Sequence, residues 1–83
     1  MKPVYVITRN IVTPSSNILE TVLVTPNFDK AEKEFIAQRE DAYNYAKDNG
    51  FVIDSIGDDE FTSCSPDKKQ RYDVKIQLCD IEH

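Results

Sequence analysis

The sequence predicts an α+β fold: one mostly antiparallel sheet of four to five strands, with a single amphipathic helix packed on one face. Three observations support this prediction. Residues 27–50 combine helix start and stop signals with an apolar stripe, residues 3–12 and 18–25 are rich in β-branched residues, and residues 70–81 alternate between apolar and polar side chains. A single helix that covers one face of such a sheet is the simplest architecture that buries the apolar stripe of the helix and the apolar face of the sheet.

The first two strands are expected to form a hairpin. Residues 3–12 carry apolar side chains at successive positions, such as Val4 and Tyr5, which point to opposite faces. Apolar residues on both faces are typical of a central strand. Residues 13–17 are polar or proline and therefore predict a turn. Residues 18–25 then form the return strand.

The helix is predicted from Asn27 to Gly50. Asn27 is a good N-cap, and Asp29 with Glu32 is an alternative capping box. Gly50 fits the left-handed position that ends a helix. Arg39 falls within the apolar sector of the helix. Its stem is expected to pack on the sheet with the charged end at the rim; alternatively, Arg39 is a buried ion-pair partner or a recognition residue. At 100° per residue, five side chains gather within about 60° of one another. They are Phe28, Ala31, Phe35, Ala42 and Ala46.

After the helix, short apolar runs separated by polar turns predict two or three further strands. The last one is the clearest, because Tyr72, Val74, Ile76 and Leu78 share one face of an alternating pattern. The element order is then β-β-α-β-β-β, in a single α+β domain over residues 1–83. The predicted strands are 51–56, 61–64 and 70–81.

Composition and charge favour some classes of partner over others. The chain has 15 acidic and 10 basic residues, a net charge of −5. An acidic protein is a poor match for nucleic acid, so we expect a protein partner with a basic surface and no direct nucleic-acid contact. The sequence has no 18-residue apolar run and no recognisable export signal, which predicts a cytoplasmic protein without membrane contact.

The residues needed for catalysis or metal binding do not form a recognised pattern. The one histidine is His83, the chain has only two glycines, and no serine lies in a nucleophile elbow. Cys64, Cys79 and His83 have no zinc-ligand spacing. We therefore predict no enzyme, no cofactor and no metal, with both cysteines as free thiols.

Acidic residues concentrate around the turn at residues 57–60. A solvated turn is the simplest interpretation, and a contact with a basic protein surface is the functional alternative. A calcium loop is excluded because its alternating oxygen ligands are missing. The predicted partner-binding residues are Asp54, Asp58, Asp59, Glu60, Glu40 and Asp41.

Two segments resemble a known group of proteins. The helix opening Lys30–Glu32 and the closing strand Tyr72–Ile76 are similar in layout to small β-β-α-β-β proteins of bacteriophages and mobile elements, of the anti-CRISPR or anti-defence type. The resemblance implies a non-enzymatic, acidic inhibitor that blocks a basic surface of a host defence complex of the CRISPR type. The alternative is a small structural or regulatory module that forms a homodimer through a strand edge or through the tyrosines beside the helix stripe.

Overall fold

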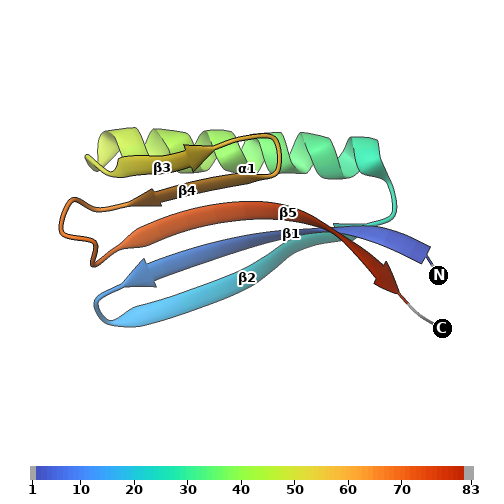
Figure 1. Cartoon of the computed structure of the whole chain (residues 1–83), viewed down its shortest axis with the longest axis horizontal. Coiled ribbons are helices and arrows are strands. Elements are labelled where there is room, and N and C mark those ends of the chain that lie inside the picture. The colour runs from blue at the N-terminus through green and yellow to red at the C-terminus, as the bar shows by residue number, and fades with distance from the viewer. Residues whose placement is uncertain (1, 82–83) are drawn as a thin grey trace.

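In the described part of the chain, five antiparallel strands and one helix make up the α+β fold that the sequence predicts. The computed structural model describes residues 2–81. The strand order is β2-β1-β5-β4-β3, and α1 lies against one face of the sheet (Figure 1). The elements are β1 (Lys2–Thr13), β2 (Ser16–Thr25), α1 (Phe28–Asp48), β3 (Val52–Ile56), β4 (Glu60–Cys64) and β5 (Arg71–Ile81).

Strand β1 lies inside the sheet, between β2 and β5. This inner place agrees with the prediction from the sequence, because apolar residues on both faces are typical of a central strand. Ile7 faces α1 and is fully buried, whereas Val4 is nearly buried and belongs to the opposite set of side chains. The pairing with β5 runs from Lys2 opposite Ile81 to Val12 opposite Arg71.

Both predicted ends of α1 are confirmed. The Asn27 side-chain oxygen accepts a hydrogen bond from the backbone N–H of Lys30 at 3.0 Å, which satisfies one free amide of the first turn. Gly50 has a φ of 70°, the left-handed conformation that glycine adopts at little cost. α1 is not a candidate membrane span, and no other helix occurs among residues 2–81.

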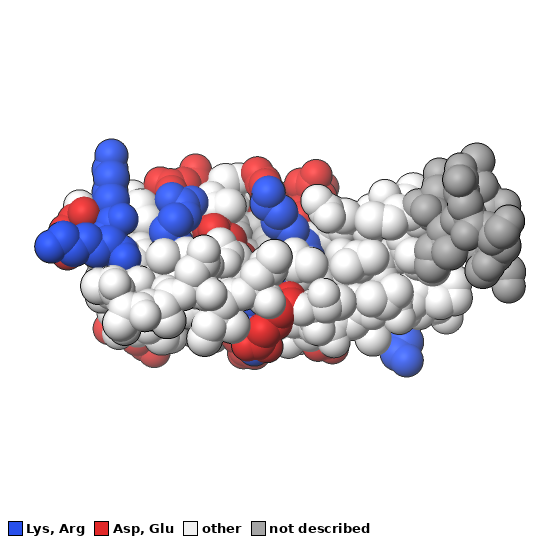
Figure 2. Space-filling view, turned by 90° about the horizontal axis from the view of Figure 1, so that it is seen from below, with Lys and Arg blue, Asp and Glu red and all other residues white. Residues whose placement is uncertain are grey.

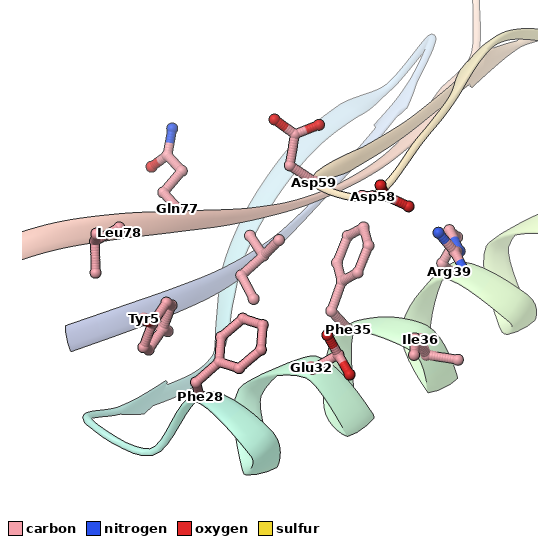
Figure 3. A pocket seen from close by; sticks show the side chains of 11 residues that line it. Tyr5, Phe28, Glu32, Phe35, Ile36, Arg39, Asp58, Asp59, Gln77 and Leu78 are labelled. Atoms are coloured by element: carbon pink, nitrogen blue, oxygen red, sulfur yellow. The ribbon is translucent and has the colours of Figure 1, made fainter.

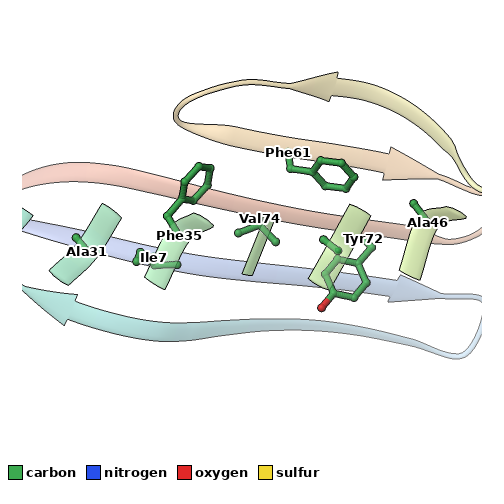
Figure 4. Packing of buried hydrophobic residues seen from close by; sticks show 8 residues of the cluster. Ile7, Ala31, Phe35, Ala46, Phe61, Tyr72 and Val74 are labelled. Atoms are coloured by element: carbon green, nitrogen blue, oxygen red, sulfur yellow. The ribbon is translucent and has the colours of Figure 1, made fainter. Parts of the chain in front are cut away.

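The core lies between α1 and the sheet. The helix contributes a stripe of small and aromatic residues, of which Phe35 is the largest, and the sheet contributes Phe61 and Val74 (Figure 4). The rings of Tyr43 and Phe61 meet edge to face, and Tyr45 packs against Phe51 and Tyr72, so both tyrosines form the margin of this core. The buried helix residues are Ala31, Phe35, Ala42 and Ala46.

The prediction that Phe28 belongs to the buried stripe is wrong. Phe28 remains 49% exposed, and its ring packs on Tyr5 with 5.3 Å between ring centroids. The reason is the unequal length of the strands beneath the helix. β4 pairs with β5 only as far as Lys75, so near Phe28 the strands β3 and β4 no longer extend the sheet beside β5.

We expect Phe61→Ala to lower the free energy of unfolding by about 3–5 kcal/mol, because it removes a fully buried ring and leaves a cavity. Phe28→Ala removes the same atoms from a half-exposed site and should cost less than about 1.5 kcal/mol. Urea denaturation of both variants measures the difference. Equal losses would contradict the placement of these two rings.

Candidate functional site

An open groove lies between the first half of α1 and the end of β5. Its volume is about 630 Å³. The helix forms one wall, β1 and β5 form the floor, and the β3–β4 turn closes one end (Figure 3). The lining residues are Tyr5, Phe28, Glu32, Phe35, Ile36, Arg39, Asp58, Asp59, Ile76, Gln77 and Leu78.

Much of the groove surface is apolar and accessible. Leu78 on the floor is 61% exposed, and Phe28 and Ile36 on the helix are also exposed. Large apolar side chains that gather in one hollow, rather than being scattered singly, mark interaction sites. The alternating pattern of β5 predicts that Leu78 is in the core, and the structure shows that it is not.

The β3–β4 turn is fixed to the helix by Arg39. The Arg39 guanidinium lies over the Phe35 ring, 5.5 Å from its centroid, and its Nη1 donates a hydrogen bond of 2.6 Å to the Gly57 carbonyl. The Gly57 amide in turn donates to the Glu60 carbonyl at 2.9 Å. The guanidinium therefore both covers the Phe35 ring and holds the turn at the groove.

Asp58 and Asp59 are the two predicted site residues that line the groove. Both are exposed, and neither forms an ion pair within the described part of the chain. Figure 3 shows Asp58 near Arg39, and it shows the Asp59 carboxylate pointing away from the helix. Glu32 adds a third carboxylate from the helix wall, and it was not among the site residues predicted from the sequence.

Asp54 and Glu60 lie elsewhere and are already paired. The Asp54 carboxylate is 3.6 Å from the Arg71 guanidinium, and the Glu60 carboxylate is 4.0 Å from the Lys75 ammonium. Glu60 and Lys75 are opposite each other on the face that α1 does not cover. The Arg71 guanidinium also donates a hydrogen bond to the Asp73 carboxylate. This hydrogen bond is the main reason why the pKa of Arg71 is raised above its ordinary value.

Glu40 and Asp41 point to different sides of the helix. Glu40 follows Ile36 by about one turn, so it extends the flank that borders the groove. Asp41 is rotated by about 100° from Glu40, toward the other flank. Both side chains are exposed. The six predicted acids therefore do not form one patch.

A second hollow, of about 330 Å³, lies on the face of the sheet that is free of α1. Its charged residues, Asp73 and Lys75, have opposite signs and balance each other. The other lining residues are Thr8, Asn10, Asn17 and Leu19. This hollow shows neither the apolar surface nor the charge excess of the first.

The two cysteines do not come together. Cys64 is buried opposite Arg71, whereas Cys79 is exposed opposite Val4, and both are free thiols. His83, the third residue weighed as a metal ligand, lies outside the described residues. Among the residues that the structure describes, no group of three or more His, Cys, Asp or Glu is placed to hold a metal ion.

Comparison of the chain with protein-family models, with curated proteins and with solved structures finds no match.

We expect Arg39→Met to loosen the turn while the core stays intact, because methionine retains an apolar stem but cannot donate to the Gly57 carbonyl. The free energy of unfolding should fall by about 1 kcal/mol, and the Gly57 amide should exchange faster with solvent. Hydrogen exchange followed by NMR measures this. Lys33→Met, on the exposed side of α1, is the matched control and should change neither quantity.

Proposed function

We propose that the chain is a non-enzymatic protein-binding module, which docks onto a basic protein surface through the groove and its acidic end. The observation that carries this proposal is the position of Asp58 and Asp59. They are exposed and form no ion pair among the described residues, and they stand at one end of an apolar groove.

The two parts of the site contribute differently to binding. Apolar side chains such as Leu78 and Ile36 release ordered water when a partner covers them, which supplies affinity. The carboxylates supply orientation and a faster encounter, because a net charge of −5 attracts a basic surface over a distance set by the salt concentration. Asp54 and Glu60 contribute less, since neighbouring cations already offset their charge.

At a finer level, we take the partner to be a host defence complex of the CRISPR type and the chain to be an inhibitor encoded by a bacteriophage or mobile element. The resemblance of Lys30–Glu32 and Tyr72–Ile76 to such proteins supports this proposal, and so does the acidic composition. A basic surface that normally binds nucleic acid is a suitable target for exposed carboxylates. The inhibitor would act in the cytoplasm without a cofactor and without direct contact with nucleic acid or membrane.

We expect the double charge reversal Asp58→Lys with Asp59→Lys to weaken partner binding at least tenfold. The double variant Asp41→Lys with Asp48→Lys changes the net charge equally, but on the other flank of α1, and should retain binding. Affinity purification from a host lysate at low and at raised salt, with quantitative mass spectrometry, compares the two.

The same pair of variants tests the finer proposal in cells. Wild-type protein and the Asp41, Asp48 control should protect a targeted plasmid from CRISPR interference, and the Asp58, Asp59 variant should not. Equal effects of both variants on binding would refute a docking site at the groove. Binding without protection would refute the inhibitor proposal alone.

The alternative, a homodimeric module, is favoured by one observation. β2 is an edge strand of ten residues with one charged side chain, and it exposes Ile18, Leu19 and Val24. Figure 2 views the molecule from the side of β2 and shows a largely uncharged band along its length. Long uncharged edges favour pairing between copies.

If β2 mediates a dimer, the wild-type protein should associate as its concentration rises, and Leu19→Lys should keep it monomeric, because a charge at an exposed edge opposes pairing. Sedimentation equilibrium measures both. A wild-type protein that stays monomeric at millimolar concentration would exclude the homodimer.

A further inference from the structure

We propose that the groove binds an extended, basic segment of the partner as an additional β-strand, paired with the free edge of β5 at residues 77–81. This inference rests on the proposed protein-binding function and specifies the form of the bound segment. It is argued from the unequal pairing of β5, the apolar groove beside it and the acidic residues at one end.

The first step is the free edge. β5 pairs with β1 along its whole length, to Ile81, but its pairing with β4 ends at Lys75. The backbone N–H of Ile76 still donates to the Asp59 carbonyl at 2.9 Å. Beyond Ile76, and within residues 2–81, β5 has a ladder on one side only. Figure 1 shows β5 continuing well past the turn that joins β3 to β4.

The second step concerns the direction of the backbone groups on this edge. In an antiparallel strand, the N–H and C=O of one residue point to the same neighbour, and successive residues alternate between neighbours. Because the Ile76 amide faces β4, the N–H and C=O of Leu78 face the same side, where β4 is no longer present. The Leu78 backbone therefore offers a donor and an acceptor to an incoming strand.

The third step is the fit of an extended chain. Residues 77–81 span about 16 Å, which matches a strand of about five residues. Such a strand would lie beside β5 and beneath the first half of α1, where Phe28 and Ile36 form the exposed wall. Alternate side chains of the segment would enter the groove, so apolar residues at every second position are expected. Strand addition to a sheet edge is a recurring mode of peptide recognition.

The fourth step is the charge of the occupant. Glu32, Asp58 and Asp59 line the groove. Among residues 2–81, Arg39 is its only cationic lining residue, and Arg39 already donates to the Gly57 carbonyl. A segment with Lys or Arg near the β3–β4 turn would complement these carboxylates. A second copy of the chain is a poor occupant, because pairing two β5 edges would bring both acidic groups and two net charges of −5 together.

The probe for the experiment is a displayed library of random nine-residue peptides, selected on the full chain. We expect the selected peptides to combine alternate apolar residues with Lys or Arg. A synthetic copy of one selected peptide is then methylated at single backbone nitrogens. Methylation should abolish binding at every second position only, because only alternate amides of an added strand face β5. Failure to select any peptide, or equal tolerance at all positions, would overturn the inference.

Variants of Leu78 test the protein side. Leu78→Pro removes the N–H at the free edge of β5. The pairing with β1 should remain, because the Leu78 N–H faces away from β1 and proline is tolerated at sheet edges. Leu78→Ala removes the side chain and keeps the N–H. We expect Leu78→Pro to bind the selected peptide at least tenfold more weakly than Leu78→Ala does. Circular dichroism and urea denaturation check that both variants fold.

Amide hydrogen exchange of the wild-type protein provides a readout that needs no substitution. The Leu78 amide should exchange quickly in the free protein and slowly with the selected peptide bound. If the Leu78 amide of the free protein instead exchanges more slowly as the protein concentration rises, a second copy of the chain occupies the edge. That result would contradict the inference.

The results also separate this inference from the proposed function. If the native partner loses binding on charge reversal at Asp58 and Asp59 but binds Leu78→Pro as well as Leu78→Ala, docking at the groove stands and strand addition fails. If charge reversal has no effect on the native partner, the proposed function fails as well.

Discussion

The long antiparallel pairing of β1 with β5 determines the position of every other element. It joins segments from opposite ends of the described chain, from Lys2 opposite Ile81 to Val12 opposite Arg71. Closing so long a loop costs conformational entropy, and burial of Ile7 and Val74 against the helix offsets this cost. Because β1 and β5 are central, β2 is added on one side and the β3–β4 hairpin on the other.

The groove follows from a difference in length between the helix and the second hairpin. α1 has 21 residues and is about 32 Å long. β4 has five residues and covers about 17 Å. The second hairpin can therefore accompany only about half of the helix, and the rest of α1 faces β5 across an open space. The exposed apolar residues Phe28, Ile36 and Leu78 lie where this hairpin is missing.

The fold also separates acidic residues that are close in the sequence. Glu60 begins β4 and meets Lys75 across the sheet, so its charge is partly offset by an exposed ion pair. Asp58 and Asp59, only two residues and one residue earlier, remain in the turn and are held at the groove by the bond between Arg39 and the Gly57 carbonyl. Charge in this region is thus divided between a paired set on the open sheet face and an unpaired set beside apolar surface.

The sequence alone determined the secondary structure and the fold class. Asn27 and Gly50 set the ends of α1 through local hydrogen bonds and backbone conformation, and the alternation in 70–81 defined the two faces of β5. These features depend on residues close in the chain, so pattern and propensity suffice. The tertiary structure decided which apolar residues are buried. Phe28 and Leu78 follow the apolar pattern of the core and yet are exposed, because the pairing of β4 with β5 ends at Lys75 and leaves them uncovered. How far two strands pair is not specified by the pattern of either strand alone. The tertiary structure also decided which acids face the groove, since Arg39 and Gly57 are 18 residues apart and meet only in the folded chain.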